Sequence, residues 1–288
     1  MNYKTFATIV VATRNRLELL QKMLENTKKQ NRYPQCEIIV MDDASDVEIK
    51  DSLISIFPEV TFVRVPTQAG YVWLRNEAFR KASSEYVFFL DDDSWFEQND
   101  AVERAVNFFH EHVNAGILSF EVRLADGSAL PKTHKKRPYK TSSFIGVAHA
   151  VKKPFFENED IYDSDYFRQG EERDLALRCL DKGYDIMQVG DITVYHEETP
   201  KERNHQFIHG YAFRNELIFY LTRFPAVLAP VFMIKCIVSH TFFCMRKRWF
   251  HAYFFGLSEF FKKFRLFYKK RKSVSFKTTI KYLSLRKV

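Results

Sequence analysis

The sequence predicts an α/β protein built on a doubly wound mixed sheet flanked by helices, with a helical C-terminal region rich in aromatic and basic residues. Two observations predict the sheet. Short apolar strand patterns alternate with helical patterns, and polar clusters follow directly after several of the strands. A third observation marks the other region, because from about residue 205 aromatic residues crowd together and acidic residues become rare. We therefore expect a globular domain at 1–204 and a helical region at 205–288.

The expected elements alternate along the first region. Short, β-branched strand patterns occur at Phe6–Ala12, Cys36–Met41, Thr61–Val65 and Tyr86–Leu90. Helical spacing of apolar residues occurs between them, at Leu17–Lys29, Asp46–Phe57 and Tyr71–Ala82. Further along, helices are expected at Ala101–His112 and Gly170–Lys182. Strands are expected at Gly116–Leu124, Tyr184–Val189 and Ile192–Tyr195. In such a sheet the ligand crevice lies at the carboxyl ends of the strands.

The net charge of +8 is unevenly distributed. From Arg246 to the end, fourteen Lys or Arg stand against one acid, Glu259, so this tail carries +13 and the rest of the chain −5. The four cysteines are scattered and form no CxxC pair. We therefore expect neither a disulfide framework nor a zinc site, and we expect a reducing compartment. The first residues carry no targeting pattern, which predicts a cytosolic body.

The clearest candidate site is the acidic run Asp91, Asp92 and Asp93, which follows an apolar strand. Three adjacent carboxylates repel one another, so a fold keeps them together with a cation or many donors nearby. A carboxylate pair that binds Mg²⁺ or Mn²⁺, which in turn holds a diphosphate, would explain the run. A solvated turn that caps the next helix would also explain it, but the position at a strand's carboxyl end favours the metal.

Other polar groups gather near the same predicted edge. Asp42 and Asp43 end a strand, where a carboxylate could accept the imide N–H of uracil or thymine, or could simply cap a helix. The nearby cations suit a diphosphate, although surface solvation explains each one alone; they are Arg14, Arg16 and Arg75.

Two further groups lie later in the chain. Glu171 and Glu172 begin a helix, where carboxylates ordinarily favour the helix dipole but where a general base could also stand. His196 follows a strand and is either a metal ligand or an ordinary strand-end histidine.

Taken in order, five segments resemble those of the family-2 glycosyltransferases, which are inverting enzymes with the GT-A fold. The segments are IVVATRNR, VMDDASD, GYVWLRNEAFRKA, YVFFLDDDSWF and GEERDLALRCLDKGYDI. They resemble the family's opening strand and turn, its VDDGS element, its arginine-bearing helix, its DxD strand and its ED helix. The resemblance covers roughly Phe6 to His196. It implies a nucleotide-sugar donor, a divalent metal, and a glycan or lipid-linked acceptor in cell-surface polysaccharide synthesis.

The resemblance also implies a role for each matching residue. The donor, expected to be a UDP- or dTDP-sugar, would contact Thr13, Arg14, Asp43, Arg75, Asp91 and Asp92. The Mg²⁺ or Mn²⁺ ion would contact Asp93, Asp91 and His196. Glu172, six residues before Arg178, would be the general base. Two positions depart from the family pattern, since Arg14 stands where a tyrosine is usual and Glu172 is one methylene longer than the usual aspartate.

The C-terminal region suggests a membrane. Phe224–Met245 is mostly apolar and about long enough to span a bilayer, but Lys235 would be costly there. Beyond it, aromatic residues interleave with Lys and Arg, which is typical of a helix lying in an anionic membrane surface. We expect residues 246–288 to bind such a surface and the protein to be peripheral on the inner face of the cell membrane. The alternative is that the aromatics pack on the first domain. No nucleic-acid module is recognised, so no nucleic-acid partner is expected.

Two other functions compete with glycosyl transfer. A sugar-nucleotide pyrophosphorylase shares this type of fold but carries a glycine-rich opening loop, and TRNR contains no glycine. A catalytically inactive membrane scaffold is disfavoured by the intact acidic run and by Glu172. The sugar, the acceptor and the linkage are expected to depend on loops, here Leu130–Ile145 and Asn158–Gln169.

Overall fold

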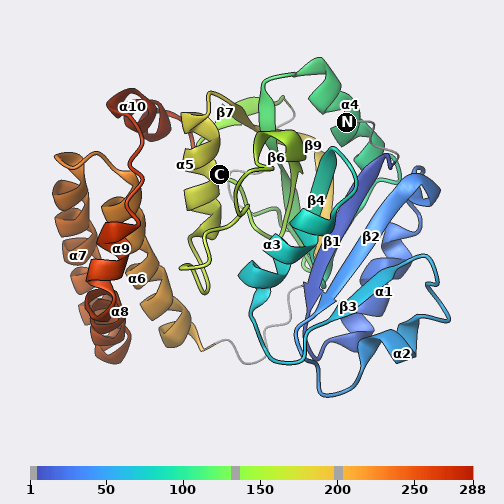
Figure 1. The fold of residues 1–288 in the computed structure, drawn as a ribbon, viewed down its shortest axis with the longest axis horizontal. Coiled ribbons are helices and arrows are strands. Elements are labelled where there is room, and N and C mark those ends of the chain that lie inside the picture. The colour runs from blue at the N-terminus through green and yellow to red at the C-terminus, as the bar shows by residue number, and fades with distance from the viewer. Residues whose placement is uncertain (1–4, 131–136, 198–203, 288) are drawn as a thin grey trace.

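A computed structural model describes residues 5–130, 137–197 and 204–287. Within these ranges the chain forms one mixed sheet of nine strands with helices on both faces (Figure 1). The strands are β1 (Ala7–Thr13), β2 (Cys36–Asp42), β3 (Thr61–Arg64), β4 (Tyr86–Asp91), β5 (Ser94–Phe96), β6 (Ala115–Leu124), β7 (Tyr139–Thr141), β8 (Ala148–Lys152) and β9 (Asp185–His196). The predicted α/β class with a doubly wound mixed sheet is confirmed.

The strand order places a crevice beside β1. The order is β3-β2-β1-β4-β8-β6-β9-β5, with β7 paired to β9. The first four strands are parallel, and the chain steps outward from β1 to β3 before β4 returns to the other side of β1. At such a switch point the loops leaving two neighbouring strands separate, which opens a ligand site at their carboxyl ends.

Helices cover both faces because the strands are apolar on both. The helices of the first region are α1 (Leu17–Thr27), α2 (Ile49–Leu53), α3 (Tyr71–Lys81), α4 (Ala101–Glu111) and α5 (Glu171–Asp181). Ile9 and Val11 of β1 join a core with α1 and α4, whereas Val10, between them, joins the core that contains α3 and α5. The near-continuous apolar runs of the central strands are therefore buried on both faces of the sheet.

Several predicted boundaries differ from the structure. The helix expected over Asp46–Phe57 is only the short α2. The two strands expected around Gly190 are one strand, β9, whose register against β6 shifts between Phe120 and Glu121. The residues between the two expected strands therefore mark an irregularity in the pairing rather than a break in the strand. The strands β5, β7 and β8 were not predicted, because they are short and pair with partners distant in the chain.

Five helices make up the C-terminal region: α6 (His205–Arg223), α7 (Leu228–Lys247), α8 (Phe250–Lys262), α9 (Phe264–Lys269) and α10 (Phe276–Ser284). In Figure 1, α6 to α9 lie at the left, on the far side of α5 from the sheet. Leu177 of α5, Leu217 of α6 and Phe260 of α8 belong to one continuous core. Beyond α10, the carbonyl oxygen of Arg286 accepts a hydrogen bond from the backbone N–H of Ser142 at 2.8 Å. The start of α6 lies next to the expected boundary at residue 204, and the division into two domains stays a prediction.

Candidate active site

A cavity of about 760 Å³ opens at the carboxyl ends of β1 and β4. The walls come from the turn after each of these strands, from the start of α3, from the first turn of α5 and from the end of β9. Every site residue predicted from the sequence lines it: Thr13, Arg14, Asp43, Arg75, Asp91, Asp92, Asp93, Glu172 and His196. The fold therefore gathers into one place residues that are up to 183 positions apart. Their individual roles stay predictions.

Asp91, Asp93 and His196 form a candidate metal centre. β5 pairs antiparallel with β9 so that Ser94 lies opposite His196. This pairing brings His196 Nε2 to 3.3 Å from Asp93 Oδ1. One ligand atom from each of the three side chains lies within 4.8 Å of the other two. Two carboxylates and an imidazole suit a divalent cation such as Mn²⁺ or Mg²⁺, so the residues present fit the metal that the sequence predicted.

Arg16 bridges the second and third aspartates. Its guanidinium contacts Asp92 Oδ1 and Asp93 Oδ2, each at 2.5 Å. Burial opposes ionisation of Asp93, but hydrogen bonds from His196 and Arg16 outweigh it and hold the pKa of Asp93 below its usual value. The sequence placed Arg16 near this edge without giving it a partner. In the structure Asn15 takes a positive φ of 56° and turns the chain just before Arg16.

Asp92 faces β1. Its Oδ2 accepts a hydrogen bond of 2.7 Å from the Thr13 hydroxyl, while its Oδ1 receives Arg16. The side chain is almost fully buried, and this burial raises the pKa of Asp92 to about 7 in spite of Arg16. Thr13 and Asp92 are therefore joined by a hydrogen bond. Asp92 also holds the Arg16 guanidinium in place through their ion pair. Arg14 is exposed at the rim of the cavity.

Asp43 and Arg75 are held from α3 and the loop before it. The Asp43 carboxylate accepts hydrogen bonds from the backbone N–H of Ala69 at 2.7 Å and of Gly70 at 3.1 Å. Gly70 has a φ of 85°, a conformation that favours glycine. Arg75 is 3% exposed and donates to Asp91 Oδ1 at 2.7 Å, whereas the Asp91 side chain is 40% exposed. Arg75 therefore orients Asp91 from behind, and Asp91 is the group that the cavity presents.

The two glutamates of α5 occupy different environments. Glu171 is buried and accepts a hydrogen bond from the Tyr71 hydroxyl. Burial, together with the neighbouring charge of Glu172, raises the pKa of Glu171 well above its usual value. Glu172 is half-buried, lines the cavity and lies against Gly146, where an added Cβ would come within 2.1 Å of Glu172 Oε1. Gly146 thus leaves the space that the Glu172 carboxylate occupies, a requirement that the sequence analysis missed.

The remaining wall comes from the two loops expected to set specificity. Phe144 and Ile145 end the first loop, and Phe167, Arg168 and Gln169 end the second. Residues 131–136 of the first loop lie outside the described ranges.

Comparisons with known proteins give a family model and several relatives. The family model described as Glycosyl transferase family 2 matches residues 8–159. YwdF, an uncharacterized glycosyltransferase of Bacillus subtilis, is 29% identical over 141 residues, which cover 46% of this chain and 49% of YwdF. The dTDP-rhamnosyl transferase RfbF of Shigella flexneri is 23% identical over 214 residues, which cover 68% of this chain and 70% of RfbF. The chain spans about half the length of several curated relatives that it matches, YwdF among them.

Solved structures share the fold. S. aureus TarS 1–349, in complex with UDP-GlcNAc, gives a TM-score of 0.61 at 14% identity and covers 80% of this chain and 71% of that one. The mannosyltransferase PcManGT of Pyrobaculum calidifontis, in complex with GDP-Man and Mn²⁺, gives 0.60 at 16% identity and covers 98% of this chain and 80% of that one. At this identity the likeness shows the fold alone, and it confirms the GT-A fold.

Proposed function

Because the chain belongs to glycosyl transferase family 2, we propose that it transfers a sugar from a nucleotide-diphosphate sugar to a hydroxyl group of a glycan or lipid-linked acceptor. One observation carries the proposal: a single cavity presents the cluster of Asp91, Asp93 and His196 together with the carboxylate of Glu172. The first group suits a metal-bound diphosphate and the second suits a general base. The names of two relatives, a putative teichuronic acid biosynthesis glycosyltransferase of Bacillus subtilis and an O-antigen chain rhamnosyltransferase of Salmonella anatum, support a role in cell-surface polysaccharide synthesis.

The donor would be held by residues at the ends of the parallel strands. Asp91, Asp93 and His196 would hold Mg²⁺ or Mn²⁺, which when bound supplies positive charge to the donor's diphosphate. The solved neighbour with GDP-Man and Mn²⁺ supports a divalent ion. Asp43 has lone pairs left after accepting from Ala69 and Gly70, so it can accept the imide N–H of a UDP- or dTDP-sugar. Arg75 donates to Asp91 and holds its carboxylate in position.

The reaction would be one displacement with inversion. The acceptor oxygen attacks the anomeric carbon of the sugar, and the bond from that carbon to the phosphate oxygen breaks. The electron pair of that bond leaves with the nucleoside diphosphate. Glu172 accepts the proton that the acceptor hydroxyl loses. Inversion follows because attack and departure take place on opposite faces of the sugar.

Glu172→Gln tests this mechanism. The substitution keeps the size of the side chain but removes its basicity, so transfer should fall by about 10²–10⁴-fold while nucleotide binding stays within about twofold. Purified protein, incubated with a panel of nucleotide sugars and Mn²⁺, would be assayed for sugar transfer and for release of nucleoside diphosphate. Full turnover in the variant would remove Glu172 from the mechanism. Absence of nucleotide binding to the wild-type protein, with and without metal, would favour an inactive scaffold, and formation of a nucleotide sugar from a sugar phosphate would favour a pyrophosphorylase.

We also propose that α7 rests on an anionic membrane surface on the cytoplasmic side. Among the described residues it is the one helix long and apolar enough to cross a membrane. Only 17% of its apolar stretch is buried inside the protein, so most of that stretch is exposed. Five of its exposed apolar residues repeat at helical spacing: Val231, Ile234, Val238, Phe242 and Met245. Three exposed cations, residues 246–248, follow at its end. Such a stripe beside basic residues suits partial insertion among anionic headgroups. The expected contact over 246–288 would therefore begin earlier, on α7.

Vesicle sedimentation would test the docking. The full chain should sediment with vesicles that contain phosphatidylglycerol and much less with phosphatidylcholine alone. Ile234→Asp and Phe242→Asp should each weaken binding by at least about tenfold. Val47→Asp, at an exposed apolar position on the sheet domain (68% exposed), is the matched control and should bind normally. Equal binding by all three variants would contradict the proposal.

A further inference from the structure

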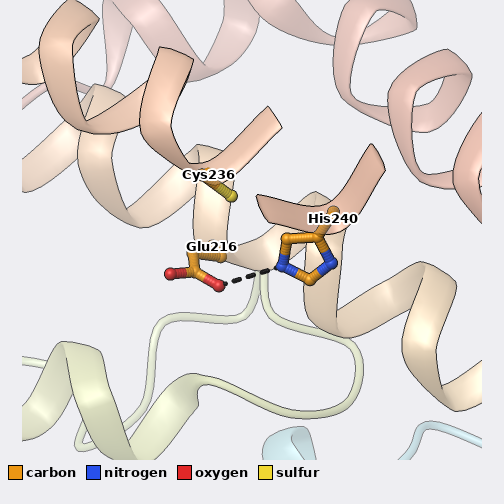
Figure 2. Close-up of side chains that lie close together, drawn as sticks. All are labelled: Glu216, Cys236 and His240. Carbon is orange, nitrogen blue, oxygen red and sulfur yellow. Dashed lines mark hydrogen bonds and ion pairs between the residues drawn. The ribbon is translucent and has the colours of Figure 1, made fainter. Parts of the chain in front are cut away.

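We propose a second metal site, formed by Glu216 of α6 with Cys236 and His240 of α7, that takes Zn²⁺ or another thiophilic divalent cation. Cys236 and His240 are four residues apart, so they project from one face of α7 toward Glu216 on the facing helix (Figure 2). One ligand atom from each side chain lies within 4.8 Å of the other two. Glu216 Oε2 and His240 Nε2 are 3.2 Å apart.

The chemistry of this donor set differs from that of the active site. A thiolate, an imidazole and one carboxylate are the ligands that zinc takes in tetrahedral sites, and three protein ligands leave the fourth position for water. The sequence predicted no zinc site because it contains no CxxC pair. Here the ligands come instead from two neighbouring helices, with a one-turn spacing on α7 that a search for paired cysteines does not detect.

The surrounding groups orient the ligands as a metal site requires. The Tyr220 hydroxyl donates to Glu216 Oε1 at 2.8 Å, and Arg173 contacts the same oxygen at 3.1 Å. These contacts leave Oε2 directed at His240. On its other side, His240 Nδ1 lies 3.1 Å from His209 Nε2. A hydrogen bond donated from Nδ1 to His209 leaves the Nε2 lone pair of His240 free to bind a cation, which is the usual outer-shell arrangement of a metal-bound histidine.

Burial and charge also suit a cation. The Cys236 residue is 4% exposed, and the His240 and Glu216 side chains are 14% and 23% exposed. A carboxylate and a thiolate together would offset the two positive charges of such an ion. Binding of zinc would release the proton of the Cys236 thiol into solvent.

A metal at this point would tie a weakly anchored helix to the catalytic half. The residues of α7 that are buried are few: Ala229, Cys236 and Cys244. The cluster contains Cys236, the middle residue of these three, and joins α7 to α6. The cluster also reaches α5, because Glu216 contacts Arg173 of that helix. Arg173 directly follows Glu172 in the chain. The proposed role is structural, a cross-link that holds α7 against α6.

Cobalt binding to the full chain tests the site. One equivalent of Co²⁺ should give the near-ultraviolet charge-transfer band of a thiolate ligand. The cluster of Asp91, Asp93 and His196 contains no sulfur and cannot produce that band. The band should vanish in Cys236→Ser and persist in Cys244→Ser, a buried cysteine two turns further along the same helix. It should also persist in Asp93→Asn.

Zinc affinity and zinc-edge X-ray absorption complete the test. Tyr220→Phe removes an outer-shell contact and should weaken Zn²⁺ binding by about 10–100-fold in competition with a chelator. The wild-type zinc complex should show one sulfur neighbour at about 2.3 Å. This spectrum requires no variant, so misfolding of Cys236→Ser would leave the test intact. A spectrum without sulfur, or a cobalt band that Cys236→Ser retains, would overturn the proposal.

Discussion

Replacing Gly146 with alanine should move the Glu172 carboxylate while leaving the fold intact. An added Cβ would lie 2.1 Å from Glu172 Oε1, whereas ordinary contact begins at 3.4 Å, so the carboxylate must retreat by about 1.3 Å. The other nearest atoms belong to the same flexible side chain, at 3.1 and 3.4 Å. The strain can therefore be relieved by rotating Glu172 alone.

The expected cost falls on the chemical step. A misplacement of about 1 Å in a reacting group can reduce a rate by about 100-fold, which corresponds to about 2.7 kcal/mol in the activation barrier. Donor binding should be almost unchanged, because the expected donor residues lie on α3 and on or directly after β1, β2 and β4, whereas Glu172 lies on α5. The φ angle of Gly146 lies outside the left-handed region, so alanine is expected to leave the free energy of unfolding unchanged or to raise it by about 0.4–1 kcal/mol.

A double-mutant cycle separates this mechanism from a general disturbance. The assay is kcat for transfer in Gly146→Ala, in Glu172→Gln and in the double variant. If Gly146→Ala acts by displacing the base, it should reduce kcat in the wild-type background and do almost nothing once Glu172 is glutamine. An equal loss in both backgrounds, or a kcat within twofold of wild type for the single variant, would refute the reasoning.

Three further outcomes are expected. Asp93→Asn should weaken Mn²⁺-dependent nucleotide binding, measured by calorimetry with and without the metal, because it removes a charged ligand from the cluster with Asp91 and His196. Arg16→Met should leave Asp92 and Asp93 without their cation, which raises the pKa of Asp93 toward its usual value and lowers the urea midpoint at pH 7 more than at pH 3. Glu171 has a raised folded-state pKa, so the folded protein holds this proton more tightly than the unfolded chain and stability falls as pH rises above about 4.3. Glu171→Gln should flatten that fall in urea titrations between pH 5 and 8.

Strand patterns in the first ninety residues predicted the sheet edge well, for a physical reason. Parallel strands buried on both faces are apolar along their whole length, so β1, β2 and β4 stand out as short β-branched runs. The polar residues that follow such runs must meet at one edge. Asp43 and Asp91 were predicted in this way, whereas Thr13 was predicted from the family resemblance.

The rest of the site depends on contacts that no local pattern reveals. His196 reaches Asp93 because β5, only three residues long, pairs with the end of β9 about a hundred residues later. The role of Gly146 depends on where α5 lies, and that position is set by packing between distant segments. The Arg16 contacts likewise follow from the fold, since an arginine in a polar turn looks the same whether it faces solvent or a carboxylate.

The C-terminal helices help to position Glu172, the proposed catalytic base. Asp174, two residues after Glu172, is fully buried and accepts hydrogen bonds from Arg178 at 2.8 Å and from Arg223, the last residue of α6, at 2.5 Å. A chain cut at residue 204 would lose Arg223 and leave Asp174 with only one of its cations. Removing a partner from a buried ion pair typically costs about 3–5 kcal/mol, a large part of the stability of most domains. A functional boundary at residue 204 would therefore require α5 to find another partner for Asp174. The buried pair instead makes α6 part of the scaffold that places Glu172, whatever the outer helices bind.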